Sequence, residues 1–175
     1  MLPEERPAVR WAFLYFFAVL CGYYILRPLR DEMGIAGGVK NLPWQFTATF
    51  VVMLLAVPFY SAVVARFPRR KIIPVVYRFC ALNLLAFLLL DRAGVSEVWV
   101  ARVFFVWVSV FNLFVVSIFW SFMVDTFRPE QGKRLFGAIA AGGSLGAIAG
   151  PLLATLLVKP FGRAGLYVAA ALLLE

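Results

Sequence analysis

The chain has 175 residues, of which 63% are hydrophobic and 15% are charged, and its formal net charge is +8. A globule of this length has too little interior to bury so many apolar side chains, so the composition excludes an ordinary soluble domain and a disordered chain and predicts an all-α integral membrane protein. The basic residues lie mostly between apolar runs, where they set membrane orientation, so we do not expect nucleic acid as a partner.

Residues that support catalysis or metal binding are scarce in this sequence. Histidine is absent, which removes histidine-based catalysis and the common zinc and haem ligands. The two cysteines, Cys21 and Cys80, lie inside separate apolar runs and lack the spacing of a metal site, so we expect them to be packing residues. No pair of acidic residues lies inside an apolar run, where a membrane-embedded enzyme would need one. We therefore predict a protein that is not an enzyme and has no cofactor or metal.

Six apolar runs predict membrane helices, since a helix needs about 20 apolar residues to cross a bilayer. The first five are long enough to span, and the sixth is shorter and ends at Glu175. A membrane helix does not end within lipid, so we expect the sixth run to begin a longer helix and the chain to be the first half of a larger protein. The expected amino-terminal transmembrane half-domain, residues 1–175, has spans at residues 9–31, 42–65, 72–90, 98–124, 134–158 and 164–175.

The first span carries two arginines near its end. Residues 11–26 are uncharged and rise about 24 Å as a helix, short of the roughly 30 Å hydrocarbon core, so a full-length helix brings Arg27 and Arg30 to the bilayer or its edge. Tyr23 shares a helical face with both arginines, and Asp31 can pair with Arg27. We expect Tyr23, Arg27 and Arg30 to bind a phosphate or carboxylate and Asp31 to complete the substrate site by holding Arg27 in position. Alternatively, Arg27 reaches the lipid headgroups and Asp31 neutralises it.

The loops that follow the second and third spans predict the orientation of the chain. The loop at residues 66–71 holds four positive charges and no negative one, whereas the loop at residues 91–97 is net negative. The positive-inside rule places the first loop in the cytoplasm, and the N-terminus, two crossings earlier, lies there too. We expect a multi-pass protein of a bacterial inner membrane with a cytoplasmic N-terminus.

The same basic loop has the order Ser61-x-x-x-Ala65-Arg66-x-Pro68-Arg69-Arg70. It resembles the loop signature of the major facilitator superfamily, G-x-x-x-D-[RK]-x-G-[RK]-[RK], at Arg66, Arg69 and Arg70, although an ordinary basic cytoplasmic loop explains these charges equally well. Asp125, at the end of the fourth span, is expected at the same membrane level. We predict that it forms an ion-pair latch with the three arginines.

Two polar residues share a face of the fourth span, and three glycines share a face of the fifth span. Ser109 and Asn112 share a face, and we take Asn112 as a candidate substrate ligand, although hydrogen bonding between helices explains the pair as well. Gly142, Gly146 and Gly150 also share a face, where a neighbouring helix can approach closely, and Pro151 permits a bend. From Gly137 the order G-x8-G-x3-G-P resembles the fifth-span signature of facilitator antiporters, while ordinary small-residue packing predicts the same close contact.

A further element points to one family. The end of the first span, Ile25-Leu26-Arg27-Pro28-Leu29-Arg30-Asp31, is similar to the I-L-R-x-x-K-D element of the nucleotide transporter family, the ATP/ADP translocases of plastids and intracellular bacteria, which is related to the major facilitators. Phe119-Trp120 and Glu130-x-x-Lys133-Arg134 resemble elements of the family's fourth and fifth spans. The resemblance implies twelve helices in two halves, a carboxy-terminal half as partner, and Arg30 in place of a functional lysine. Val108 stands where the family has a functional glutamate.

Together these features predict a secondary active transporter. It would have the six-helix amino-terminal bundle of a major-facilitator-type protein and move a small organic anion across the lipid bilayer by alternating access. The resemblance implies a nucleotide as substrate, in ATP/ADP-type exchange. The alternative is a non-transporting membrane sensor or scaffold with a transporter fold, which the valine at position 108 favours.

Overall fold

The computed structural model of the protein describes the backbone of residues 3–66 and 69–175, and the side chains of these residues except 3, 63–65, 69 and 70. Within these ranges every regular element is a helix. Two short 3-10 helices, η1 and η2, precede α1 and α2. In chain order the elements are η1 Pro3–Glu5, α1 Arg6–Ala36, η2 Val39–Asn41, α2 Leu42–Arg66, α3 Arg69–Arg92, α4 Glu97–Thr126 and α5 Pro129–Leu172.

Five helices of the described chain are long and apolar enough to cross a membrane, which confirms the prediction of an all-α protein with five membrane-length helices. α1 is longer than its predicted span at both ends, because residues 6–8 and 32–36 continue the helix. The facilitator-type arrangement and a complete sixth helix stay predictions. After the break at Gly162, where φ is 60° and ψ is −156°, α5 continues only to Leu172.

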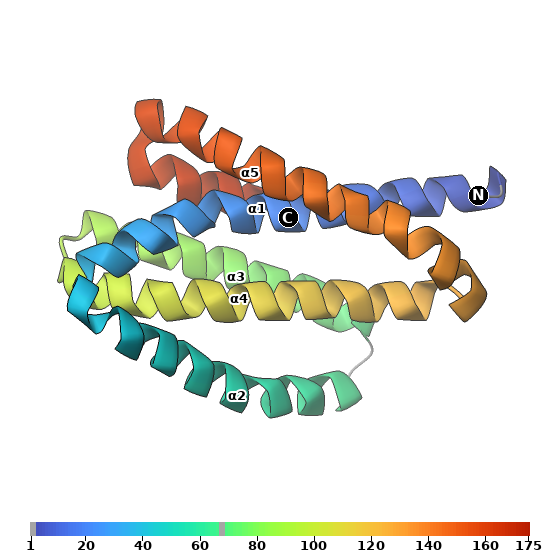
Figure 1. The fold of residues 1–175 in the computed structure, drawn as a ribbon, viewed down its shortest axis with the longest axis horizontal. Helices are drawn as coiled ribbons and strands as arrows, with labels where there is room; N and C mark the ends of the chain where they lie inside the picture. The colour runs from blue at the N-terminus through green and yellow to red at the C-terminus, as the bar shows by residue number, and fades with distance from the viewer. Residues whose placement is uncertain (1–2, 67–68) are drawn as a thin grey trace.

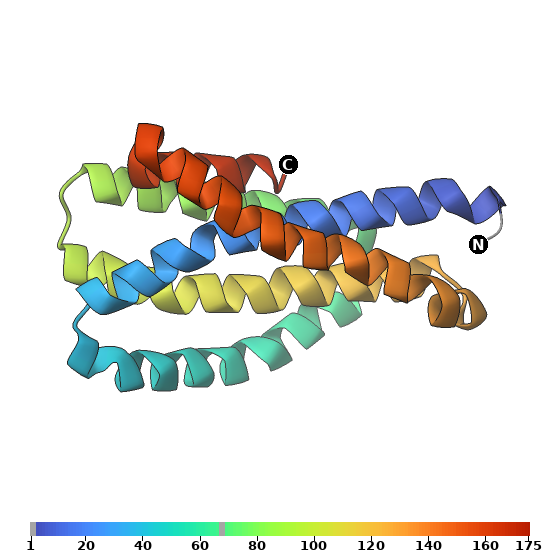
Figure 2. The same ribbon diagram turned by 45° about the horizontal axis from the view of Figure 1, so that its top comes forward.

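Gly162 divides α5 into a first limb, residues 129–161, and a second limb, residues 163–172. The second limb turns back alongside the bundle, so the C-terminus lies near the middle of its length (Figures 1 and 2). The positive φ at Gly162 lies in the region that side chains disfavour, which explains glycine at this reversal. Pro151, in contrast, lies within helical backbone.

The helices form a bundle with α1 near its centre. α1 packs along α5 and α4, α3 packs against α4 and α5, and α2 packs mainly against α4 (Figure 1). The start of α1, the end of α2 and the start of α5 lie at one end, which we call the Arg6 end. The α1–α2 turn, the α3–α4 turn and the reversal of α5 lie at the opposite end, which we call the Gly37 end.

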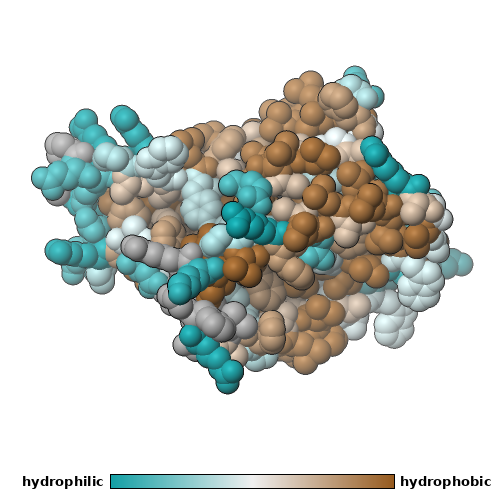
Figure 3. All heavy atoms as spheres, turned by 180° about the vertical axis from the view of Figure 1, so that it is seen from behind, coloured by the Kyte–Doolittle hydropathy of each residue, from teal (hydrophilic) through white to brown (hydrophobic). Residues whose placement is uncertain are grey.

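Apolar side chains cover much of the outside as well as the core. Phe104, Phe119 and Tyr167 are fully buried between helices, while Trp44, Phe59 and other large apolar residues are exposed. On the face in Figure 3, hydrophobic residues cover the middle of the molecule and hydrophilic ones gather toward the ends, with a smaller hydrophilic patch between them. This surface suits a lipid environment, consistent with a multi-pass membrane protein.

Candidate functional site

The contact between α1 and α4 sets the register of the candidate site. Phe16 stacks on Phe119 with ring centroids 4.3 Å apart. Toward the Gly37 end, the guanidinium carbon of Arg30 lies 5.0 Å from the ring centroid of Phe105. The two contacts are separated by the same number of residues along each helix: from 16 to 30 in α1 and from 119 back to 105 in α4. This equal spacing is expected for two antiparallel helices. Arg30 therefore lies on the same face of α1 as Phe16, the face that packs against α4.

Arg30 is held by one residue on each helix. Its Nη1 donates to Oγ of Ser109 at 3.3 Å, and its Nε and Nη2 donate to Oδ1 of Asp31 at 3.0 and 2.8 Å. The Arg30 side chain is 16% exposed and that of Asp31 is 54% exposed. A guanidinium has five N–H donors, so Arg30 keeps donors on its terminal nitrogens for an anion.

The predicted pairing of Asp31 with Arg27 is wrong in this structure. Asp31 pairs with its neighbour Arg30, while the guanidinium of Arg27 lies 5.5 Å from the ring centroid of Tyr24. Side chains on a helix lean toward its N-terminus, which carries Arg27 back over the preceding turn and away from Asp31. Arg27 is exposed, whereas Arg30 is partly buried.

Tyr23 and Asn112 lie midway between the two contacts that set the register. Tyr23 is seven positions from both Phe16 and Arg30 in α1, and Asn112 is seven positions from both Phe105 and Phe119 in α4. Tyr23 and Asn112 therefore lie at the same level of the α1–α4 interface. Tyr23 is 8% exposed, and Oδ1 of Asn112 is buried with no hydrogen-bond partner among the described residues. Such an unpartnered acceptor costs about 1–3 kcal/mol. Asn112 therefore offers an acceptor at the level of Tyr23, and among the described residues no hydrogen bond joins the two side chains.

The predicted latch lies at the Arg6 end, far from this site. Arg66 ends α2 and Asp125 lies in the last turn of α4, and both are exposed. The ends of these helices lie at the same end of the bundle (Figure 1). The side chains of Arg69 and Arg70 lie outside the described residues, so the latch stays a prediction.

The glycine face of α5 lies against α1. A Cβ at Gly142 would meet the Phe13 carbonyl oxygen, and one at Gly146 would lie 2.5 Å from that of Phe17. One at Gly150 would lie 2.9 Å from the carbonyl oxygen of Cys21. The neighbouring helix thus approaches backbone to backbone along this stretch.

An ionic cluster at the Gly37 end was missed by sequence reasoning. Arg163 donates to Glu32 at 2.7 Å and to Glu97 at 3.1 Å, and its Nη1 lies 3.7 Å from Oδ1 of Asp91. These residues come from α5, α1, α4 and α3 respectively. All four residues lie in or next to loops that the sequence places on the same side of the membrane. This shared side is the sequence feature from which the cluster could have been predicted.

Comparisons with known protein families, with curated proteins and with solved structures find no match to this chain. The likeness to nucleotide transporters therefore rests on the short sequence elements themselves. The element at residues 25–31 contains Arg30 and Asp31, which form the ion pair of the candidate site. Val108, at the position of the family's glutamate, is fully buried in the core.

Proposed function

We propose that the protein is a secondary active transporter of an organic anion and that Arg30 is its main binding cation. The observation that carries this proposal is the placement of Arg30 against Ser109. Ser109 is about 18 Å along α4 from Glu97, at 1.5 Å per residue, which is near the middle of this 30-residue helix. A cation at such depth costs at least about 2.5 kcal/mol, and such residues usually face a wet cavity or a partner.

The surroundings of Arg30 suit a small anion. Asp31 accepts from Nε and Nη2 of Arg30 and Ser109 accepts from Nη1, so each terminal nitrogen keeps one N–H group for a phosphate or carboxylate. Arg27 adds a second positive charge one turn away, so the cluster of Arg27, Arg30 and Asp31 has a net charge of +1. A carboxy-terminal half would supply the other wall of the cavity, and rocking of the two halves would expose the site alternately.

A nucleotide is the narrower form of this proposal. It rests on the similarity of residues 25–31 to the nucleotide transporter element. The translocases have a functional glutamate where this chain has Val108, and Val108 is fully buried. The carboxylate that the family uses at this position is therefore absent, which disfavours ATP/ADP exchange of the family type. We therefore propose an organic anion with a phosphate or carboxylate group, of which a nucleotide is one example.

Uptake by the full-length protein in proteoliposomes tests the function. We expect saturable uptake of at least one radiolabelled organic anion, and the nucleotide form requires that ATP or ADP compete with it. Arg30→Ala should abolish uptake, whereas Arg92→Ala, which removes an exposed arginine at the Gly37 end, should leave it unchanged. If no organic anion is taken up or bound by the intact protein, the sensor or scaffold alternative, which Val108 favours, replaces the transporter proposal.

A further inference from the structure

A buried aromatic ring lies directly against the candidate anion site. The guanidinium carbon of Arg30 lies 5.0 Å from the ring centroid of Phe105, which is 2% exposed. Ser109 accepts a hydrogen bond from Arg30, and its own hydroxyl donates to the Phe105 carbonyl oxygen at 3.0 Å. The face of an aromatic ring attracts a guanidinium, whereas a free arginine side chain has many rotamers. The Phe105 ring therefore limits the directions in which the Arg30 guanidinium can point.

The Phe105 ring is itself held by residues of α1 and α2. It packs so closely against Gly34 of α1 that a Cβ there would lie 2.9 Å from two carbons of the ring. On α2, the ring of Phe46 lies 5.2 Å from that of Phe105, between centroids, at an interplanar angle of 86°. The preceding residue, Gln45, donates from Nε2 to the Gly34 carbonyl oxygen at 3.3 Å. Residues of three helices thus meet at the ring that lies against Arg30.

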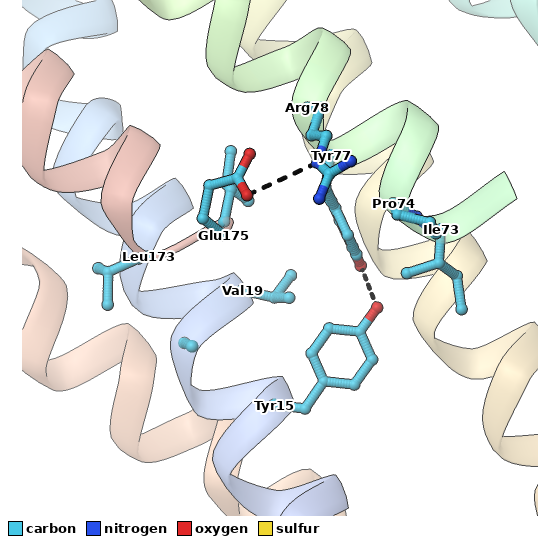
Figure 4. Close-up of a pocket in the computed structure, with 10 residues that line it drawn as sticks. Tyr15, Val19, Ile73, Pro74, Tyr77, Arg78, Leu173 and Glu175 are labelled. Atoms are coloured by element: carbon cyan, nitrogen blue, oxygen red, sulfur yellow. Dashed lines mark hydrogen bonds and ion pairs between the residues drawn. The ribbon is translucent and has the colours of Figure 1, made fainter. Parts of the chain in front are cut away.

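α3 and α2 are joined to α4 by different kinds of contact. The Tyr15 hydroxyl of α1 donates to the Tyr77 hydroxyl of α3 at 2.7 Å (Figure 4), and the Tyr77 hydroxyl donates to the Val115 carbonyl oxygen of α4 at 3.3 Å. Breaking such bonds inside a membrane leaves polar groups without partners. The contact of Phe46 with Phe105 is apolar on both sides, so its loss leaves no unsatisfied group. A shift of α2 against α4 is therefore easier than a shift of α3, and it changes the surroundings of the Phe105 ring.

We propose that Phe105 is a positioning residue for Arg30 and that Phe46 acts on the anion site through it, so that the position of α2 sets the affinity for the anion. This inference rests on the proposed function, because it takes Arg30 as the binding cation. While Phe46 packs against the ring, Phe105 holds the guanidinium beside Ser109 with its remaining N–H groups free for an anion. When α2 moves away, the ring gains freedom and Arg30 loses its fixed direction. The coupling is reciprocal, so an anion bound to Arg30 favours the packed position of α2.

Equilibrium binding of radiolabelled inorganic phosphate to the full-length protein in detergent tests this coupling. Phosphate carries the group that Arg30 is proposed to bind, and Arg30→Ala gives the level of binding without the site. Phe105→Leu should raise the Kd for phosphate about fivefold, as expected for the loss of one cation–π contact, and Phe46→Leu should raise it about threefold. Phe46→Tyr keeps the ring and should bind like the parent. Phe50→Leu, one turn further along α2 and 66% exposed in the parent, is the matched control and should leave the Kd unchanged.

A double variant shows whether Phe46 acts through Phe105. In the Phe105→Leu background, Phe46→Leu should have no further effect on the Kd, because the ring through which it acts is gone. Thermal unfolding of each preparation is the control for folding, and if Phe105→Leu does not fold, the comparison of Phe46→Leu with Phe46→Tyr decides.

Two sets of outcomes separate this inference from the proposed function. Additive effects of the two substitutions, an unchanged Kd in Phe105→Leu or Phe46→Leu, a Kd that Phe46→Tyr does not restore, or an equal effect of Phe50→Leu would each overturn the coupling alone. If the parent does not bind phosphate, or if Arg30→Ala binds it like the parent, the proposed site fails and the coupling fails with it.

Discussion

Arg163 donates a 2.7 Å hydrogen bond to Glu32, and this contact fixes α5 to α1 at the Gly37 end of the bundle. At the Arg6 end, Arg134 donates a 2.7 Å hydrogen bond to Glu5, whose side chain is 7% exposed. The glycine face of α5 lies between these two ion pairs. The α1–α5 pair is therefore tied at both ends and closely packed in the middle, and we expect it to move as one unit.

The close packing makes a first prediction at Gly146. Gly146→Leu should destabilise the folded protein by about 2 kcal/mol or more, because its Cβ would meet the backbone of α1, which cannot move aside as a side chain can. Gly137→Leu is the matched control on the same limb, since a Cβ there meets nothing within 4 Å. Thermal unfolding of the purified variants in detergent measures both effects. Equal stability of the two variants would show that the glycine contact is not close in the membrane.

A second prediction concerns the ionic cluster around Arg163. Arg163→Met should lower the free energy of unfolding by about 1 kcal/mol, a modest effect because Glu32 and Glu97 are more than half exposed and solvent screens the pairs. The difference in free energy of unfolding between the parent and the variant should be smaller in high salt, because salt weakens exposed ion pairs in the parent protein. Unfolding at low and high ionic strength tests this, with Lys159→Met, an exposed cation near the same end, as the control. A loss that does not depend on salt would instead indicate that the Arg163 stem contributes through packing.

A third prediction separates an anion-binding Arg30 from one that reaches lipid headgroups. Arg30→Lys keeps the charge but loses the fork, so the Kd for an organic anion found in the uptake assay should rise about tenfold, as expected for one charge-assisted hydrogen bond. Arg30→Ala should bind weakly or not at all while inserting normally. Equilibrium binding to the detergent-solubilised protein measures the Kd. If both variants bind like the parent and only the membrane orientation changes, Arg30 has no part in the site.

The unpartnered acceptor of Asn112 leads to a fourth prediction. Asn112→Leu removes a buried amide oxygen that has no partner among the described residues and introduces an apolar side chain of similar size, so stability should stay equal or rise by about 1 kcal/mol. Binding of an organic anion that also carries a hydroxyl or amino group should nevertheless weaken, because the acceptor for that group at the level of Tyr23 is lost. Unfolding and binding are measured on the same preparation. A large loss of stability would mean that Asn112 has a structural partner in the membrane, and unchanged binding would remove it from the candidate site.

Much of the helical fold could be predicted because its cause is local. A run of apolar residues such as 98–124 must satisfy its backbone hydrogen bonds internally in lipid, so its sequence determines a helix without reference to the rest of the chain. The small face at Gly142, Gly146 and Gly150 is also visible from spacing. The sequence does not say which helix packs there, and the structure places α1 at this face.

The contacts of charged side chains were harder to predict because they depend on side-chain direction and on distant turns. Helical spacing favoured an ion pair between Arg27 and Asp31. In the structure the Arg27 side chain instead points toward the ring of Tyr24, and Asp31 pairs with Arg30. The cluster at Arg163 depends on the reversal at Gly162, which brings the second limb back toward α1 and α3. Gly162 lies in the loop predicted between the fifth and sixth spans, but the sequence does not say which carboxylates Arg163 meets once the chain reverses there.

The reversal at Gly162 also determines when the centre of the bundle can close during synthesis. Tyr167 on the second limb is fully buried, its hydroxyl lies 3.7 Å from Sδ of Met33, and its ring packs edge-on against Phe104. A chain made from its N-terminus exposes α1 to α4 to the membrane before Tyr167 is synthesised. The interior beside Met33 therefore stays open until translation has passed Tyr167, so α1 reaches its final packing only after α2, α3 and α4 have been made.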